Sequence, residues 1–399
     1  MVPDAIREAD VFPTIEVGFY GQVTEEDEEL SGLLAAMEMV RNGTTCFMEA
    51  GTFLFPEAAA RAATAVGIRA LLGDVVINDD PASFAMGKDE PRQDVGFIGR
   101  APRDLEGALA ALGGQLARND DPDALVRGHI AVLGLGTASE TLLLEAKRRA
   151  REAGVTLNMH HAYSVADTEA DRRRYGMDPV LRFAEMGILD PLTTLGHANH
   201  LTDAEAEALL ATGANLSWAP AASMLWGHGG TRHSRHAELW RRGVNVGLGS
   251  DSANWSNAFD LFRQAYLAVL MARDGHEDRA YLYAEDGLRM ATRGGARAVG
   301  LEAEVGSIEV GKRADLVLHT LGRPELRPTS DMVRNLVLSS GSRAIRTVVI
   351  DGRVVLDEGR FPHLDEASLL DRIDEASHRL WERMGVRPHP ERRPAASTP

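Results

Sequence analysis

Apolar segments of strand length alternate along the chain with longer amphipathic segments. No fixed-period repeat is present, and a polar or glycine-rich turn follows each apolar segment. Apolar runs predict strands at residues 43–50, 68–76, 129–134, 156–160, 193–197, 214–218 and 244–251. Amphipathic or alanine-rich stretches predict helices at residues 28–41, 56–66, 105–118 and 140–153. This alternation is typical of βα units with parallel strands.

The pattern changes in the last quarter of the chain. Residues 305–318 and 345–356 read as short β segments with glycine turns, and Asp351-Gly352 is a hairpin signal. Residues 365–384 predict a helix. We therefore expect three parts: a barrel at 1–302, a small β-sandwich segment at 303–362, and a C-terminal helix with a frayed tail at 363–399.

Four predicted strands end in side chains suited to metal or proton chemistry. These are Glu49, His160, His197 and Asp251. In a parallel barrel the carboxyl ends of the strands surround one mouth, so the four side chains are expected to converge. Two imidazoles and two carboxylates suit a divalent cation such as zinc with one position open for water.

Composition and charge narrow the class of protein. The 399 residues are 44% hydrophobic and 26% charged, which excludes disordered and fibrous classes. A net charge of −16 disfavours nucleic acid and anionic membranes as partners. The single cysteine, Cys46, excludes an internal disulfide and favours a reducing compartment, and the chain shows no export signal or membrane-length apolar run, so we expect a cytoplasmic protein. A homo-oligomer is compatible with this composition.

Several motifs occur in an order shared with a known family. They are Gly43-Thr44-Thr45, His160, the pair His197 and His200, Gly249-Ser250-Asp251, the glycine-rich run 294–300, and Gly306-Ser307-Ile308-Glu309-Val310-Gly311-Lys312-Arg313-Ala314-Asp315-Leu316-Val317. Over about residues 30–360 the chain resembles the amidohydrolase superfamily, in particular its cytosine deaminase-like and chlorohydrolase-like branch. The resemblance implies an α/β fold, a (β/α)8 TIM-like barrel with a small β-sandwich. It also implies hydrolysis of a C–N or related bond by metal-activated water.

The resemblance also implies roles for individual residues. One divalent metal, zinc with iron as the alternative, would be held by His160, His197 and Asp251. Asp251 would also accept a proton from water, and His197 would hold the hydroxide or the substrate oxygen. The residues expected to bind substrate are His200, Tyr163, Trp218, Ser223 and Trp255.

Two departures from the family pattern stand out. The His-x-His of the first strand is absent, because the first histidine of this chain is His129. We expect strand one to be missing, with the natural polypeptide starting upstream of Met1 or with residues 11–20 filling the gap. In place of the family's proton-shuttling Glu, three residues after the strand-five histidine, the chain has Tyr163. A phenol, with an ordinary pKa of about 10, is a poor substitute for a carboxylate near neutral pH.

Other candidates keep two interpretations. Glu49 is either a turn carboxylate or a catalytic pocket residue that partly replaces the missing Glu. His228, His233 and His236, which lie among glycines and arginines, are expected on a mobile mouth loop rather than in a metal site. His161 is expected to point away from the mouth, because alternate residues of a strand face opposite sides.

The sequence therefore predicts a metal-dependent hydrolase of a C–N bond, by deamination or by amide or amidine hydrolysis, in a small cyclic nitrogen compound. One alternative is a hydrolytic dechlorinase of a triazine-like ring. The other, motivated by the absent His-x-His, is a catalytically inactive or truncated barrel.

Overall fold

Parallel strands form the centre of the molecule in a computed structural model, which describes residues 18–80, 100, 104–134 and 136–385. A five-stranded sheet has the order β4-β5-β6-β7-β8, and a three-stranded sheet has the order β1-β2-β3. The strands are β1 (Cys46–Met48), β2 (Arg69–Leu72), β3 (Val126–Gly128), β4 (Ile130–Gly134), β5 (Leu157–His161), β6 (Thr193–His197), β7 (Asn215–Trp218) and β8 (Val246–Leu248).

The two parallel sheets follow each other in barrel order. β2 pairs with β3 and β4 pairs with β5, and only His129 separates β3 from β4. Among the described residues no strand joins β8 to β1. Most of the segment 11–20 lies outside the described residues. The side chains of Asn42 and Glu38 hydrogen-bond the backbone of Phe259 (3.1 and 2.9 Å), which ties the chain after β8 to the helix before β1.

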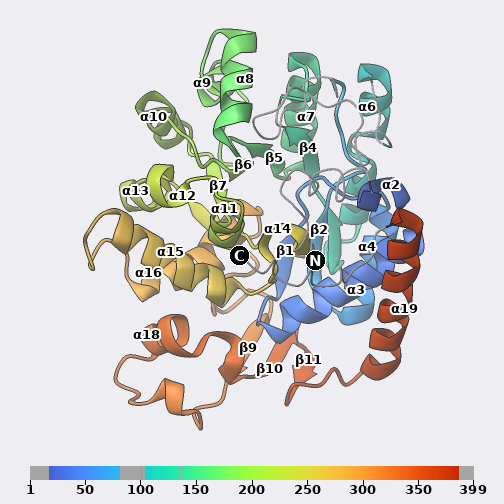
Figure 1. The fold of residues 1–399 in the computed structure, drawn as a ribbon, viewed down its shortest axis with the longest axis vertical. Helices are drawn as coiled ribbons and strands as arrows, with labels where there is room; N and C mark the ends of the chain where they lie inside the picture. Colours follow the sequence, from blue (N-terminus) through green and yellow to red (C-terminus); the bar gives the residue numbers. More distant parts are fainter. Residues whose placement is uncertain (1–17, 81–99, 101–103, 135, 386–399) are drawn as a thin grey trace, which may run out of the picture.

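Helices cover the outside of the strands (Figure 1). Residues 105–118, expected as one helix, form α6 and then a 3-10 helix, because Gly113 breaks the helix with a φ of +85°. The main helices are α3 (Glu25–Arg41), α4 (Pro56–Val66), α6 (Leu105–Ala111), α7 (Glu140–Ala153), α8 (Val165–Tyr175), α9 (Pro179–Glu185), α10 (Asp203–Thr212), α11 (Pro220–Leu225), α12 (Gly230–His233), α13 (His236–Arg242), α14 (Ala253–Ser256), α15 (Leu261–Gly275), α16 (Ala284–Arg289), α17 (Gly295–Ala298), α18 (Met332–Asn335) and α19 (Glu366–Met384). No helix in the described ranges is long and apolar enough to cross a membrane.

The predicted β appendage is an antiparallel sheet with the order β11-β10-β9. Its strands are β9 (Leu316–His319), β10 (Ile345–Ile350) and β11 (Arg353–Asp357). Within the segment 305–318, expected as short β segments with glycine turns, the glycine-rich part makes the turns and only the last residues form a strand, β9. The buried Arg69 of β2 pairs with Asp315 (3.0 Å) and Asp351 (3.3 Å), and these ion pairs fix the small sheet to the barrel.

The C-terminal helix α19 packs beside α3, so the two ends of the described chain lie side by side (Figure 1). This arrangement leaves the opposite part of the barrel, around β5 to β8, to be covered by the helices of the βα units. The predicted domain boundaries at residues 302 and 362 stay a prediction.

Candidate active site

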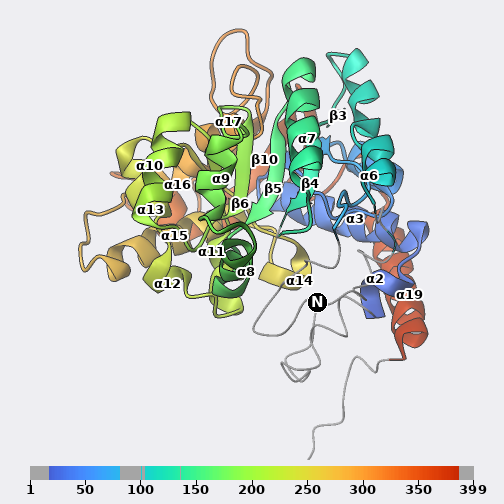
Figure 2. The same cartoon turned by 90° about the horizontal axis from the view of Figure 1, so that it is seen from above.

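Three predicted site residues meet at the carboxyl ends of β5, β6 and β8. The rings of His160 and His197 stack with their centroids 5.5 Å apart, and His197 Nε2 is 3.9 Å from Asp251 Oδ2. Figure 2 shows α8, α11, α12 and α14 at one end of the molecule, the end to which these strands lead. His161 points the other way and contacts Phe183 of α9, as strand alternation predicts.

The backbone is strained at this point. His197 and Asp251 have φ values of +68° and +64°, and Ala162 and Ala198 have +46° and +50°. A non-glycine residue in the left-handed region costs about 1–3 kcal/mol, and such residues gather at functional sites. The left-handed backbone turns the chain sharply at the ends of β5, β6 and β8, where the three site residues lie.

Hydrogen bonds orient His160 and Asp251. Nδ1–H of His160 donates to the carbonyl of Leu133 (3.0 Å), which fixes the proton on Nδ1 and leaves the Nε2 lone pair available. This is the tautomer in which a histidine binds a metal through Nε2. The backbone N–H of Ser252 donates to Asp251 Oδ1 (2.7 Å), and Oδ2 is the oxygen closer to His197.

Burial sets the charge of these groups. It lowers the pKa of His160 to about 4, with His197 as the second cause, and lowers the pKa of His197 to about 3. Burial raises the pKa of the Asp251 carboxyl, against the stabilising N–H of Ser252. Both imidazoles are therefore neutral near pH 7 and can bind a metal or accept a hydrogen bond.

Five aromatic side chains continue from this site as a ring array, defined as Tyr163, His197, His228, Trp255 and Trp226. The Tyr163 ring centroid lies 4.7 Å from that of His197, 4.0 Å from that of His228 and 6.0 Å from that of Trp255. The rings of Trp255 and Trp226 are 4.7 Å apart. Trp226 also donates from Nε1 to the Trp255 carbonyl (2.9 Å). Tyr163 is thus the central member of the array.

The sequence placed His228 on a mobile mouth loop and did not predict its contact with the ring of Tyr163. Gly227 and Gly229 flank this residue with φ values of +67° and +74°, a backbone that glycine adopts without strain. The N–H of His228 donates to the Ser223 carbonyl (3.0 Å). Its Nε2 is buried with no hydrogen-bond partner among the described residues. The glycines on both sides were the signal, since they permit the turn that brings the ring against Tyr163.

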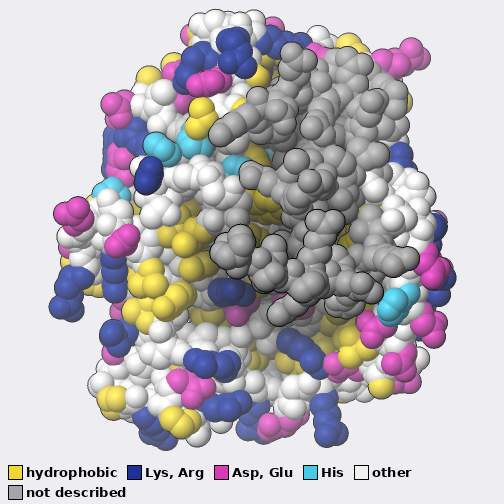
Figure 3. All heavy atoms as spheres, viewed as in Figure 1, with side chains coloured by type: hydrophobic (Ala, Val, Ile, Leu, Met, Phe, Trp, Pro, Cys, Tyr) yellow, Lys and Arg dark blue, Asp and Glu magenta, His cyan; other side chains and the backbone are white. Residues whose placement is uncertain are grey.

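The other predicted substrate-binding residues have different surroundings. Trp218 is buried in the core, where it stacks on His236 of α13 at 4.9 Å. His200 faces His233, with 5.5 Å between the ring centroids. Ser223 is buried in α11. On the face seen in Figure 3, histidine and hydrophobic side chains lie next to one another. The substrate roles of these residues stay predictions.

Glu49 has both carboxylate oxygens engaged by the turn that follows β1. Oε2 accepts from the N–H of Gly51 (2.8 Å), and Oε1 accepts from the N–H (2.6 Å) and the hydroxyl (3.1 Å) of Thr52. Burial raises the pKa of this carboxyl, against these hydrogen bonds. The geometry favours the turn-carboxylate interpretation, and the catalytic role stays a prediction.

A complete metal site is not present in the described part of the chain. No group of three or more His, Cys, Asp or Glu side chains there is placed to hold a metal ion. His160 and Asp251 each carry a suitable donor atom, but with His197 they do not form a three-ligand set. His160 and Asp251 therefore supply donors for part of a metal site, the described residues alone do not complete it, and the ligand set stays a prediction.

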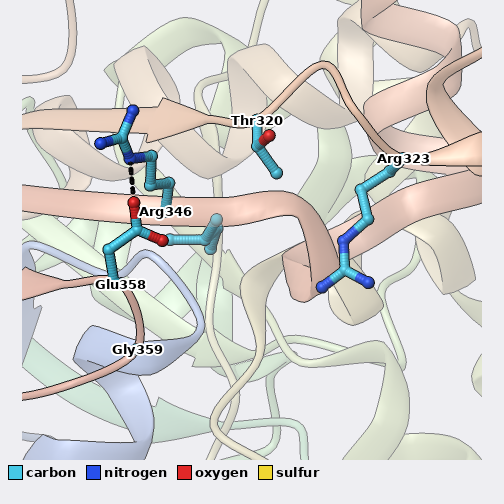
Figure 4. Close-up of a pocket in the computed structure, with 6 residues that line it drawn as sticks. Thr320, Arg323, Arg346, Glu358 and Gly359 are labelled. Atoms are coloured by element: carbon cyan, nitrogen blue, oxygen red, sulfur yellow. Dashed lines mark ion pairs between the residues drawn. The ribbon is translucent and has the colours of Figure 1, made fainter.

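A hollow of about 440 Å³ lies elsewhere, at the small sheet (Figure 4). It is lined by Thr320, Arg323, Ile345, Arg346, Glu358 and Gly359. Its charges are partly neutralised, because Arg346 Nε pairs with Glu358 Oε1 at 2.6 Å. It has none of the strand-end residues described above and is not the candidate active site.

Comparison with known sequences gives a family match that covers most of the chain. The amidohydrolase family matches residues 4–355. A 5'-deoxyadenosine deaminase of Methanosarcina mazei is 30% identical over 363 residues, which cover 91% of this chain and 78% of the relative. A 5-methylthioadenosine/S-adenosylhomocysteine deaminase of Syntrophobacter fumaroxidans is 30% identical over 352 residues, 88% of this chain and 75% of the relative.

Solved structures show the same architecture. An adenosine deaminase from Xanthomonas campestris with bound zinc superposes with a TM-score of 0.82 at 25% identity, covering 94% of this chain and 80% of that one. An atrazine chlorohydrolase from Arthrobacter aurescens TC1, complexed with zinc, gives a TM-score of 0.79 at 20% identity, with coverages of 91% and 80%. The predicted barrel fold is confirmed, and zinc occurs in these structural neighbours.

Proposed function

The chain belongs to the amidohydrolase family, and from this premise we propose that it is a hydrolytic deaminase of adenosine-type nucleosides. The predicted class, a hydrolase of C–N bonds other than peptide bonds, is confirmed by the family membership. The observation that carries the proposal is the meeting of His160, His197 and Asp251 at one barrel end in a chain whose relatives are named as deaminases of adenine nucleosides.

In the proposed reaction, water replaces the amino group at C6 of the purine and ammonia leaves. Asp251 Oδ2 accepts a proton from the water, because Oδ1 is engaged by Ser252 and the raised pKa makes the carboxylate a stronger base. Neutral His197, 3.9 Å from Oδ2, is placed to hydrogen-bond the incoming oxygen. The ring array supplies flat apolar surfaces for a planar base.

A bound divalent metal, proposed to be zinc, would lower the pKa of the attacking water. Support comes from zinc in the structural neighbours and from the free Nε2 of His160. Metal content per chain, measured by elemental analysis, tests this part of the proposal separately from activity.

The test of the proposed function is release of ammonia from 5'-deoxyadenosine, 5'-methylthioadenosine and adenosine by the purified chain, supplied with zinc. We expect ammonia and the 6-oxo nucleoside in equal amounts from at least one of them. If none of the three yields ammonia, deamination of adenosine-type nucleosides is wrong.

Dechlorination of a triazine-like ring is the second candidate, favoured by one observation. Tyr163 occupies the place of a proton-shuttling Glu, and a chloride leaves without a proton. The structures of triazine hydrolases support the fold alone at 20% identity. Chloride release from a chlorotriazine, in place of ammonia from a nucleoside, would decide for this candidate. The third interpretation, an inactive barrel, predicts neither product.

A further inference from the structure

Deamination needs a partner for the departing amino group. In this chain the phenol of Tyr163 stands where a carboxylate would serve, and a phenol is a weak base and a weak acid near neutral pH. A second polar group beside Tyr163 is therefore needed to stabilise the nitrogen as it gains a proton and leaves.

His228 is the polar side chain in closest ring contact with Tyr163. The ring centroids are 4.0 Å apart, and the ring of His197 lies 4.7 Å from that of Tyr163. Nε2 of His228 is buried and has no hydrogen-bond partner in the described part of the chain. A buried polar atom without a partner is costly, so its persistence points to a ligand that completes the hydrogen bond.

The loop around His228 is built to place this ring. Gly227 and Gly229 adopt left-handed φ on either side, and the N–H of His228 is held by the Ser223 carbonyl. An added Cβ at Gly230 would lie 2.2 Å from Ser223 Oγ, so the loop packs tightly against α11. The ring thus lies against Tyr163, and the backbone beside it is bound to α11.

We propose that His228 contacts the substrate and accepts a hydrogen bond from the leaving amino group through Nε2. The inference rests on the proposed deaminase function. The water oxygen bonds to C6, and the water proton taken by Asp251 passes to the amino nitrogen. The C6–N bond then breaks, its electron pair leaves with the nitrogen, and ammonia departs, while the second water hydrogen moves from the oxygen to N1 of the ring and gives the 6-oxo product. Burial keeps the pKa of His228 at about 4, so the imidazole is neutral near pH 7 and has a lone pair to offer.

Binding tests the proposal without turnover. Calorimetry in an Asp251→Asn background, supplied with zinc, compares adenosine with 6-methylpurine riboside, in which a methyl group replaces the amino group. We expect adenosine to bind about 10-fold more tightly. His228→Leu should reduce this preference to less than about 2-fold, and His228→Gln, whose amide oxygen still accepts, should restore part of it. The control is His276→Leu, since His276 also stacks on a tyrosine (Tyr281, 3.6 Å) but lies outside the array.

The ratio of kcat values on two substrates gives a second measurement. A purely structural role of His228 would lower both kcat values equally and leave this ratio unchanged. His228→Leu should lower kcat for adenosine about 100-fold but change kcat for 6-chloropurine riboside less than about 3-fold, because chloride leaves without a proton. An unchanged binding preference in His228→Leu, an equal loss on both substrates, or no nucleoside binding at all would overturn the proposal. Intact binding preference without ammonia release would instead refute the deaminase function alone.

Discussion

The two sides of the barrel mouth use their polar residues differently. At the end of β1, both carboxylate oxygens of Glu49 accept from backbone N–H groups of the turn that follows, and after β2 both oxygens of Asp74 accept from the backbone N–H groups of Gly113 and Gln115. At the ends of β5, β6 and β8, strained backbone holds His160, His197 and Asp251 against one another, with donor and acceptor atoms left available. A buried charged residue is therefore evidence for chemistry only when its hydrogen-bonding atoms are not already used by the fold.

The substitution Asp251→Asn tests most strongly whether the residues at the ends of β5, β6 and β8 carry the chemistry. The amide keeps the shape and can still accept from Ser252, but it cannot take a proton. We expect kcat for ammonia release to fall about 1000-fold, with little change in the free energy of unfolding. Steady-state kinetics and urea unfolding of the same preparation measure both. Retention of full activity would remove Asp251 from the mechanism.

Glu49→Gln tests the side of the barrel mouth at β1, where the carboxylate is expected to stabilise the turn. Glutamine has one acceptor oxygen where the carboxylate has two, so one of the N–H groups of Gly51 and Thr52 loses its partner. We expect the free energy of unfolding to fall by about 1–3 kcal/mol, with kcat within about 3-fold of the unchanged protein. The opposite pattern, lost turnover with unchanged stability, would show that Glu49 is catalytic.

Tyr163→Phe should have an intermediate effect. Phenylalanine keeps the ring contacts with His197 and His228 and removes only the hydroxyl. We expect kcat to fall about 10-fold, less than for Asp251→Asn, with KM changed little. A loss as large as that of Asp251→Asn would make the phenol, rather than His228, the main partner of the leaving group.

The smallest expected effect is on the pH dependence of stability. Burial lowers the pKa of His129 to about 4, below its ordinary value of 6.5. At pH values between 4 and 6.5 the unfolded chain binds more protons at His129 than the folded chain does. The contribution of neutral, buried His129 to the free energy of unfolding is therefore complete above pH 6.5 and is lost as the pH falls towards 4. His129→Gln should make the decline between about pH 6 and pH 5 shallower by up to about 1.4 kcal/mol per pH unit.

Urea unfolding across this pH range measures the effect of His129→Gln. In the unchanged protein, His129 Nε2 donates to the Glu49 carbonyl (2.8 Å), and the Gln amide can still donate there. The substitution therefore removes the titrating imidazole and keeps this hydrogen bond. An identical pH profile in the two proteins would show that the ring does not titrate as its burial requires.

Periodicity predicted most of the fold correctly. The helices at 56–66 and 140–153 and the strand at 193–197 have the predicted bounds, because burial and glycine caps agree there with local pattern. It missed β3 (Val126–Gly128), a short strand whose pairing with β2 is not visible in the local sequence. Position along strands likewise predicted that His160, His197 and Asp251 would meet.

The sequence could not predict which polar atoms the fold uses. Glu49 and Asp251 look alike as strand-end carboxylates, and only the loop hydrogen bonds at Glu49 distinguish them. The contact of His228 with Tyr163 joins residues 65 positions apart through a glycine turn. Such contacts depend on loop conformation, which hydrophobic periodicity does not encode.

Product analysis in 18O-labelled water tests directly whether the chain is a hydrolytic deaminase of adenosine-type nucleosides. The chain, supplied with zinc, is incubated with 5'-deoxyadenosine or 5'-methylthioadenosine, and nucleoside and ammonia are quantified by mass spectrometry and enzymatic assay. We expect one 18O atom in each 6-oxo nucleoside formed and one ammonia released with it, and we expect Asp251→Asn to abolish both. Unlabelled product, or unchanged nucleoside with no ammonia, would contradict it.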